Sequence, residues 1–461
     1  LIPAPQDTIK DIYPLTPLQN GMLFHTLSEQ SLGMYVNQSL VELDGELDVT
    51  ALESAWQWVI NQHDMLRTGF IWQQLDEPIQ YVVKESQVDW QNINYLGKIA
   101  SEAEAELKIL AEQEVDTGFE LNKAGLMRFK LVRLAENHHC LIWTRHHLIV
   151  DGWCTNLVIR EVQEAYLAIC ANRTPAISNR PPFRNFIEWL DNRELKESEA
   201  YWQHCLNGYE TMARLPRPFN SNSGVSQQTE HLSIEQTASL KLLAAKNRLT
   251  LNSLCQAVWA LTLQRYTGSN DLVFGVTSAG RPDDLANAND IVGVFITSIP
   301  LRAQLSGEQN WVDLALQLQE QMVESREHEH VSLSNIQRLT GHQVDLFDNL
   351  LVFENYPADK QLVDRSLTLA VRETTERNNY PLTMIIIPHQ RLDFRIVSNN
   401  SQLDSSIANA LLADFMTLLA TLAKGDTSEK TGDALSCKGL VDELNTHSEQ
   451  SPAWLLNQTQ Y

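Results

Sequence analysis

Positive charge is scarce in this chain: 35 Lys and Arg stand against 58 Asp and Glu in 461 residues, a formal net charge of -23. Nucleic-acid binding needs a basic surface, so the composition excludes that class of partner. Long apolar runs are lacking as well, and a membrane-spanning helix needs about eighteen or more consecutive apolar residues. We therefore expect neither a nucleic-acid partner nor a membrane partner.

Cysteine is sparse and dispersed. The six cysteines show no C-x-x-C spacing, which predicts reduced thiols rather than a disulfide framework or a zinc site. Residues Leu1 to Lys10 contain no positively charged, apolar leader, so nothing there marks secretion. We expect a soluble, cytoplasmic protein.

Motifs of several other chemistries are also missing. Val276 stands where a G-x-S-x-G nucleophile elbow needs glycine. The stretch His328 to His330 lacks the H-E-x-x-H pattern of zinc hydrolases, so we expect no metal. No glycine-rich phosphate loop is found, and ATP chemistry would therefore belong to a neighbouring domain.

Two adjacent imidazoles lie near a carboxylate in the stretch Arg145 to Trp153 (R-H-H-L-I-V-D-G-W). Alternating apolar and basic residues predict a strand over Leu126 to Leu134, and Cys140 to Thr144 predicts a second strand after a polar turn. Such a hairpin delivers His146 and His147 to a strand end. Because neighbouring strand residues point to opposite faces, one imidazole should face a cavity and the other should be anchored in protein.

Two alternatives stay open at this point. A single His on an apolar element is more often structural than catalytic, and His138 and His139 show that adjacent pairs also occur by chance. Cys154 is close enough in sequence to be a thiol nucleophile, but a helix beginning there favours a buried, packed thiol.

The spacing H-H-x-x-x-D-G resembles the signature of acyltransferases similar to chloramphenicol acetyltransferase, above all that of the condensation domains of nonribosomal peptide synthetases. Six further segments resemble the motifs of that family in its order. They are Tyr13 to His25, His63 to Thr68, Phe183 to Leu190, Val292 to Arg302, Phe347 to Pro357 and Arg377 to Thr383.

The resemblance implies an α/β (α+β) fold of two chloramphenicol acetyltransferase-like lobes, arranged as a pseudo-dimer with a substrate tunnel between them. We place the lobe that carries the His motif at residues 1–180 and the second lobe at 181–450. Residues 451–461 resemble the start of a linker to a following adenylation domain, and Pro3 to Asp7 look like the end of another linker. The intact polypeptide is therefore expected to continue.

The implied reaction is amide formation. The amine of a carrier-bound aminoacyl acceptor attacks the thioester of a carrier-bound donor. Such an enzyme needs no cofactor of its own, because phosphopantetheine arms of the upstream and downstream carrier proteins hold the substrates. An α-amino group titrates near pH 8, so positioning and oxyanion stabilisation should contribute more than general-base strength.

The resemblance also implies residue roles. His147 should hold the acceptor amine and receive its proton, while His146 should be structural. Asp151 should turn away from the cavity and pair with Arg67, and Gly152 should allow close backbone approach. Arg67 as an ordinary surface charge is the alternative.

Other positions matching the motifs are candidates for lining the substrate channel. They are Gln19, Trp153, Thr297, Ser298, Asn355 and Tyr380. Thr297 and Ser298 depart from the Asn-Thr pair that is most common in the family, so we expect an altered substrate lining there. His328 to Leu333 matches the sixth motif only loosely, which predicts a departure from the family at that edge of the acceptor channel.

Three other functions are alternatives. An epimerisation domain shares the His motif but carries an additional acid-containing motif that this chain lacks. A non-catalytic docking platform conflicts with the intact His147, Asp151 and Gly152. An enzyme acting on a freely diffusing acyl donor conflicts with the two-lobed length. The form of Tyr13 to His25 resembles the subtype that accepts a D-configured donor.

The periodicity of apolar residues predicts further elements. Helices are expected near Leu52 to Val59, Leu157 to Ile169, Leu251 to Tyr266, Trp311 to Arg326 and Ile407 to Leu422, and strands near Val36 to Leu43, Leu272 to Thr277, Val294 to Leu301, Leu350 to Phe353, Met384 to Ile387 and Leu392 to Val397.

Overall fold

The computed structural model describes residues 2–28, 33–176, 180–209, 212–217, 224–306, 309–341, 345–355, 367–424 and 437–441. Within these ranges the chain divides into two compact units. The first unit comprises Leu1–Arg193, Arg281–Ile296 and Tyr356–Asn379, and the second comprises Glu194–Gly280, Thr297–Asn355 and Tyr380–Tyr461. The expected linker at 451–461 lies outside the described residues.

The first unit carries the His motif. Its helices are α1 (Pro17–Ser28), α2 (Val49–Gln62), α3 (Ala100–Asp116), α4 (Gly152–Cys170) and α5 (Arg184–Asp191), with short 3-10 helices η1 (Gln6–Thr8), η2 (Asp64–Arg67) and η3 (Ala288–Asp290). Its strands are β1 (Ile9–Pro14), β2 (Val36–Gly45), β3 (Thr68–Ile71), β4 (Ile79–Val83), β5 (Trp90–Asn94), β6 (Met127–Ala135), β7 (His138–His146) and β12 (Leu367–Thr375).

The described strands of this unit form two sheets. The larger sheet has the order β12-β2-β7-β6-β5 and is antiparallel except where β5 runs parallel to β6. The smaller sheet has the order β1-β4-β3. The hairpin of β6 and β7 confirms the two strands predicted around the polar turn before the His motif.

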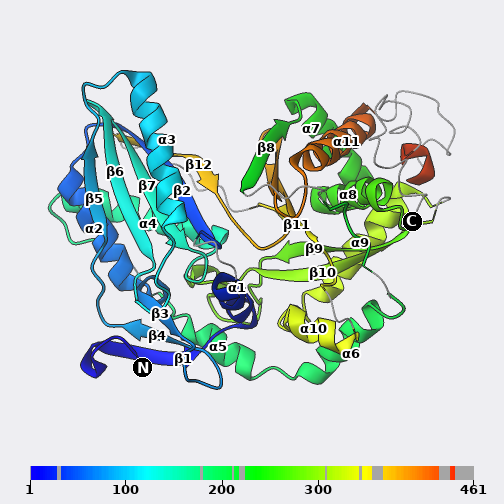
Figure 1. Cartoon of the computed structure of the whole chain (residues 1–461), viewed down its shortest axis with the longest axis horizontal. Helices are drawn as coiled ribbons and strands as arrows, with labels where there is room; N and C mark the ends of the chain where they lie inside the picture. Colours follow the sequence, from blue (N-terminus) through cyan, green and yellow to red (C-terminus); the bar gives the residue numbers. More distant parts are fainter. Residues whose placement is uncertain are drawn as a thin grey trace. The chain divides into compact units, whose positions relative to one another are not determined.

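Helices cover both faces of the larger sheet. Alternation along β7 places Ile142 with Leu107 and Ala111 of α3 on one face. On the other face Trp143 packs with Trp56 of α2, in a core that also includes α4. Figure 1 shows α3 lying over the part of the sheet formed by β6, β7 and β2. The predicted helix after β2 is confirmed, and Asp48 caps it by accepting from the Ala51 N–H at 2.9 Å.

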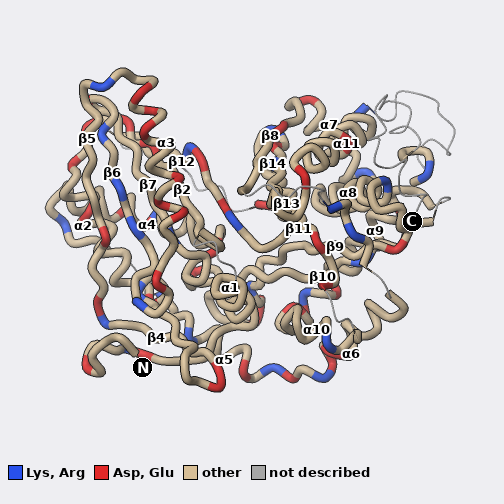
Figure 2. The backbone as a smooth tube through the Cα atoms, in the orientation of Figure 1, with Lys and Arg blue, Asp and Glu red and all other residues tan. Residues whose placement is uncertain are grey.

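Charge pairing explains the alternating pattern of β6. Glu114 near the end of α3 pairs with Arg128 at 3.0 Å and with Lys130 at 2.8 Å. In Figure 2 acidic positions (red) mark α3, and basic positions (blue) mark β6 beneath it. Arg128 and Lys130 of this strand therefore face an acidic helix, while Phe129 and Leu131 between and beside them enter the core.

Two segments from later in the chain complete the first unit. Strand β12 pairs with β2 from Leu367 opposite Gly45 to Thr375 opposite Gln38. Segment 281–296 packs against Phe183, and a Cβ on Gly293 would overlap that aromatic ring. The lobe boundary that we placed at residue 180 assigns both segments to the second lobe, whereas the structure groups them with the first unit. Long-range packing decides to which unit a segment belongs, and sequence composition does not report such packing.

The second unit is built on one sheet of described strands in the order β10-β9-β11-β13-β14-β8. These strands are β8 (Val225–His231), β9 (Asp271–Ser278), β10 (Thr297–Gln304), β11 (Asn349–Phe353), β13 (Leu382–Pro388) and β14 (Leu392–Asn399). The helices are α6 (Leu195–Cys205), α7 (Ile234–Lys246), α8 (Leu251–Thr267), α9 (Trp311–Ser325), α10 (Leu333–Leu339) and α11 (Ser405–Lys424). The helices and strands predicted here from periodicity are found, but β10 begins at Thr297 rather than at Val294.

Helix α11 is the core helix of this unit. Among the described residues it is the one helix long and apolar enough, by length and composition, to cross a membrane. Its apolar face, which includes Leu411, Phe415 and Leu419, is buried in the core. Figure 1 shows it beside α7 and α8. Core packing therefore accounts for its apolar character.

Candidate active site

Strand β7 ends at His146, and His147 begins the turn that leads into α4. Main-chain bonds hold both residues: the His146 N–H donates to Leu126 O at 3.0 Å and the His147 N–H donates to Tyr35 O at 2.7 Å. The two neighbouring strands therefore fix where the imidazoles leave the sheet.

His146 is anchored inside the unit. Its side chain is only 1% exposed, and its Nδ1 accepts the Leu148 N–H at 3.2 Å. Burial lowers the pKa of His146 to about 3, with a smaller contribution from His147. The ring is therefore neutral at physiological pH, as a structural histidine that supports the following turn should be.

This lowered pKa predicts an acid-sensitive contribution to stability. The unfolded chain binds a proton on His146 below its ordinary pKa of 6.5, whereas the folded chain resists protonation down to about pH 3. Stability should therefore fall as pH drops through this window, by about 2 kcal/mol between pH 7 and pH 5. His146→Asn keeps an acceptor for Leu148 and should remove this loss.

Urea unfolding of the wild type and of His146→Asn at the two pH values measures the difference. The same substitution at His231, whose side chain is exposed, is the matched control. An equal loss of stability on acidification in wild type and His146→Asn would contradict the assignment of the acid-sensitive group to His146.

His147 is partly exposed and carries a defined tautomer. Its Nδ1 lies 3.0 Å from Val150 O. A carbonyl oxygen only accepts, so Nδ1 carries the hydrogen and the lone pair of the neutral ring is on Nε2. The turn thus holds the imidazole by Nδ1 and leaves Nε2, on the other side of the ring, as its basic nitrogen.

Asp151 is buried and ties the turn to another segment. One carboxylate oxygen caps α4 by accepting the Cys154 N–H at 2.9 Å, and the other accepts the Phe295 N–H at 3.0 Å and the Ile296 N–H at 3.4 Å. Because these two amides serve Asp151, they are not available for sheet pairing. This explains why β10 starts only at Thr297.

Arg281 is the cationic partner of Asp151. Its guanidinium lies 3.7 Å from the carboxylate, and both side chains are nearly fully buried. Further contacts fix it: it donates to Ile291 O at 3.1 Å and stacks over the Phe295 ring at 4.1 Å. Sequence reasoning missed Arg281, although it adjoins the Ser-Ala-Gly stretch that only superficially resembles a nucleophile elbow.

The predicted pair of Arg67 and Asp151 is wrong. Arg67 is buried, but it pairs with Asp64 at 2.8 Å and donates to the carbonyl oxygens of Ile60, Val83 and Lys84. Three carbonyl acceptors and an adjacent carboxylate already satisfy the guanidinium. The second motif therefore supplies a structural arginine for η2 and β4, not the partner of the His-motif aspartate.

Cys154 behaves as the packed thiol that its position predicted. It is fully buried on α4, and burial raises its pKa well above the usual range. Its sulfur contacts Gly293 O at 3.3 Å and accepts from Arg281 at 3.0 Å. A thiol with a raised pKa is a poor nucleophile.

No group of three His, Cys, Asp or Glu side chains suited to a metal ion is found among the described residues.

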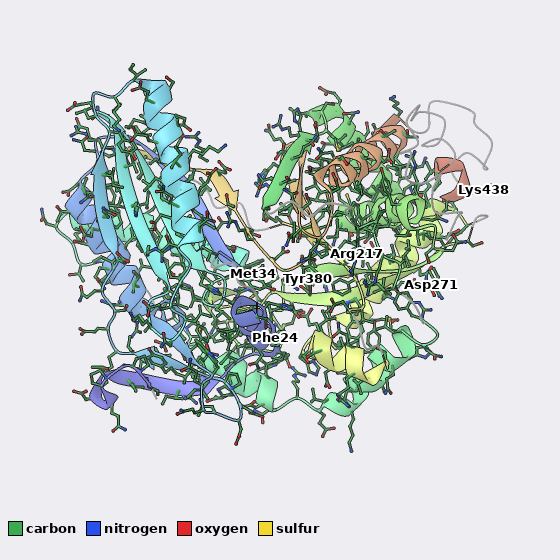
Figure 3. The ribbon with its side chains drawn as sticks, in the orientation of Figure 1. Phe24, Met34, Arg217, Asp271, Tyr380 and Lys438 are labelled. Carbon is green, nitrogen blue, oxygen red and sulfur yellow. The ribbon has the colours of Figure 1, made fainter. Side chains whose placement is uncertain are left out.

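Two of the channel candidates lie in the first unit. Gln19 on α1 is fully buried, and its amide donates to Leu148 O at 3.0 Å, so the prediction that it lines an open channel is wrong. It supports the turn after His147 instead. Trp153 on α4 is partly exposed and lies 5.4 Å from the Arg281 guanidinium. Figure 3 labels Phe24, which is 65% exposed on the same helix as Gln19.

The remaining channel candidates lie in the second unit. Tyr380, labelled in Figure 3, stacks on Phe347 at 5.5 Å and is hydrogen-bonded to Ser298. Burial raises its pKa to about 12, so the phenol keeps its proton. Thr297 lies opposite Ser278 in the register of β9 and β10, and Asn355 is exposed after β11. The structure thus brings Ser298 and Tyr380 together, whereas Asn355 is exposed to solvent.

The site and fold have clear relatives. A family model described as the condensation domain matches residues 9–436. The chain is 37% identical over 399 residues to a linear gramicidin synthase of Brevibacillus parabrevis, covering 84% of this chain and 5% of that protein. It is 31% identical over 413 residues to bacitracin synthase 3 of Bacillus licheniformis, covering 88% of this chain and 6% of that protein.

Solved structures give the same fold. The first condensation domain of the calcium-dependent antibiotic synthetase, in complex with a substrate analogue, matches with a TM-score of 0.79 at 18% identity, covering 93% of this chain and 99% of that one. The X-domain from teicoplanin biosynthesis, in complex with OxyB, matches with a TM-score of 0.76 at 21% identity, covering 90% and 94%.

The chain belongs to the condensation-domain family of nonribosomal peptide synthetases. Condensation domains are acyltransferases that form amide bonds, and they act within synthetases many times longer than this chain. The predicted α/β class and the chloramphenicol acetyltransferase-like fold are confirmed. The tunnel between two lobes concerns how the units are placed, and it stays a prediction.

Proposed function

We propose that this chain forms a peptide bond between two carrier-bound substrates. The donor is an acyl or peptidyl thioester on an upstream carrier protein, and the acceptor is an aminoacyl thioester with a free amine on a downstream carrier protein. The observation that carries the proposal is the 3.0 Å contact between His147 Nδ1 and Val150 O. Because the carbonyl can only accept, this contact places the hydrogen on Nδ1 and leaves Nε2 as the base.

The bond changes balance through this one nitrogen. The acceptor amine attacks the donor carbonyl carbon, and a carbon–nitrogen bond forms. Nε2 of His147 receives the proton that the nitrogen loses. As the tetrahedral intermediate collapses, the carbon–sulfur bond breaks, and the leaving sulfur of the donor arm takes this proton from Nε2 to become a thiol, which returns His147 to its neutral form. Because the amine is partly neutral at cellular pH, His147 mainly positions it and accepts its proton late.

Two main-chain features support the charge that develops on the donor oxygen. Gly152 is the first residue of α4, a 19-residue helix whose N-terminal end carries partial positive charge. Glycine there allows a substrate to approach the backbone closely. Asp151 does not enter this chemistry directly; its bonds to Cys154, Phe295 and Arg281 hold the helix start in place.

Partners follow from this reaction. The substrates arrive on phosphopantetheine arms of two carrier proteins, and an adenylation domain in the same polypeptide would load the acceptor. We place the work of this chain in the cytoplasm with the rest of such a synthetase. Thr297, Ser298 and Tyr380 are retained as proposed channel residues, with Trp153 beside the His motif.

One assay tests the function and separates it from its alternatives. A carrier protein loaded with a donor dipeptide and a second loaded with an amino acid are mixed with the chain, and intact-protein mass spectrometry follows both arms. Transfer of the donor onto the acceptor arm supports condensation. Stereochemical inversion leaves the mass unchanged, so the donor is also hydrolysed and its configuration read by chiral chromatography. Inversion without transfer indicates epimerisation, and no change in mass or configuration on either arm indicates a platform without chemistry.

Donor stereochemistry is a prediction of its own. The segment Tyr13 to His25 resembles the form found where the upstream residue is epimerised, so a donor ending in a D-residue should condense faster than its L-counterpart. Exchanging a side chain with a hydrogen at the α-carbon is worth about 10- to 200-fold in rate. Matched D- and L-terminated donors, loaded chemically and offered to one acceptor, measure the ratio; an L-preference would contradict the subtype alone.

A further inference from the structure

We infer that Tyr35 and Asn379 position the catalytic His147. This inference rests on the proposed function and adds two positioning residues to it. Tyr35 lies just before β2, beside Met34, which Figure 3 labels. Asn379 is the last residue of segment 356–379 and precedes the channel candidate Tyr380 in the chain. All the contacts that carry the inference lie within the first unit.

The backbone of Tyr35 is held in an unusual conformation. Its φ is 57°, in the left-handed region that few non-glycine residues adopt. Such a conformation persists only where surrounding contacts enforce it, and it is common at functional sites. Here the carbonyl oxygen of Tyr35 accepts the His147 N–H at 2.7 Å. The enforced conformation thus directs an acceptor at the backbone of the catalytic residue.

Both ends of Tyr35 are tied to the segment that arrives from far along the chain. Its N–H donates to Arg377 O at 3.1 Å, and its phenol donates to Asn379 Oδ1 at 2.6 Å. Tyr35 therefore bridges this segment and His147, with one contact from its N–H, one from its side chain and one from its carbonyl. A change at Asn379 reaches His147 through a single residue.

The segment itself is anchored to two other elements. The Asn379 amide lies 3.3 Å from Nε2 of His25 at the end of α1. Arg377 pairs with Asp116 at the end of α3 at 2.7 Å. A Cβ at Gly33 would collide with the Arg377 guanidinium, so glycine at this position allows the close approach. The partners of Tyr35 are thus fixed from both sides rather than free to follow it.

Tyr35 and Asn379 reach His147 through its backbone N–H, so we expect them to act on the geometry of the imidazole. A small displacement of a catalytic group lowers the rate of bond formation strongly while leaving remote substrate binding intact. Tyr35→Phe removes the bond to Asn379 and leaves an aromatic ring in place. It should lower kcat by about tenfold and leave KM for both carrier substrates unchanged.

The matched control is Tyr81→Phe. Tyr81 is a buried tyrosine of the same unit whose hydroxyl donates one hydrogen bond, to Asn122 O at 2.8 Å. If the hydroxyl of Tyr35 is only structural, Tyr35→Phe and Tyr81→Phe should lower the melting temperature by similar amounts and leave kcat alike. If Tyr35 positions His147, Tyr35→Phe should lower kcat and Tyr81→Phe should not, although the two variants have the same melting temperature. Tyr35→Phe combined with Asn379→Ala should be no slower than the slower single variant.

Amide exchange of His147 gives an independent readout. With nitrogen-labelled histidine, the His147 N–H should exchange faster in Tyr35→Phe and in Asn379→Ala than in the wild type or Tyr81→Phe. The inference is overturned if Tyr35→Phe matches Tyr81→Phe in both kcat and His147 exchange. A wild-type chain that forms no amide would contradict the proposed function instead, whatever the exchange data show.

Discussion

His147→Ala should lower the rate of amide formation by about 10²- to 10⁴-fold, the usual contribution of one positioned acid–base group. The fold should survive, because His147 is partly exposed and its backbone bond to Tyr35 does not depend on its side chain. Single-turnover mass spectrometry with two loaded carriers measures the rate.

His146→Asn is the control for this result. It removes an adjacent imidazole but keeps an acceptor for the Leu148 N–H, so it should retain most of the rate at neutral pH. A variant lacking His147 that still turned over at nearly the wild-type rate would remove the catalytic assignment. Selective loss of rate in His146→Asn, at unchanged stability, would exchange the roles of the two histidines.

Asp151→Asn should be the most destabilising of the single changes, by about 3 to 5 kcal/mol, because it leaves the buried Arg281 without its counter-charge. Arg281→Met should lose less, since main-chain amides of Cys154, Phe295 and Ile296 still donate to Asp151. The double variant should lose less than the sum of the two, which a urea-unfolding cycle measures.

Arg67→Met provides the matched control for that cycle. Arg67 is as buried as Arg281, but it pairs with Asp64 and shares no described hydrogen-bond or ion-pair partner with Asp151. Its effect should therefore add to that of Asp151→Asn within about 0.5 kcal/mol. The opposite result would restore the pairing of Arg67 with Asp151 that the motifs predicted. In that case the effects of Arg281→Met and Asp151→Asn would add, and those of Arg67→Met and Asp151→Asn would not.

The local part of the site could be predicted from sequence. The hairpin, the turn with its two histidines and the start of α4 at Gly152 depend on neighbouring residues, and periodicity and spacing report such neighbours. The burial of Cys154 followed from its place on that helix. Most helices and strands of the second unit were predictable for the same reason.

The long-range part could not be predicted. The partner of Asp151 comes from segment 281–296, and nothing in the composition around Arg281 indicates that it returns to the first unit. The strand propensity of Val294 and Phe295 favours a start of β10 at these residues, but their segment is held by Asp151 and by Phe183. Gln19 forms a local hydrogen-bonded pair with Thr16 at the start of α1, but its bond to the Leu148 carbonyl joins residues far apart in the sequence, and no local pattern reports it.

Strand β12 comes from late in the chain but completes the sheet of the first unit, and this order has a consequence for biosynthesis. A ribosome extends a chain from its N-terminus at about 5 to 20 residues per second. Residues 1–193 emerge early, yet the sheet edge at β2 has no partner until residues 367–375 have been made. An uncovered edge strand readily pairs with other chains. During synthesis the first unit therefore passes through a period in which the β2 edge of its larger sheet is unpaired. In that period the contacts of Tyr35 with Arg377 and Asn379, which support the His147 turn, cannot yet form.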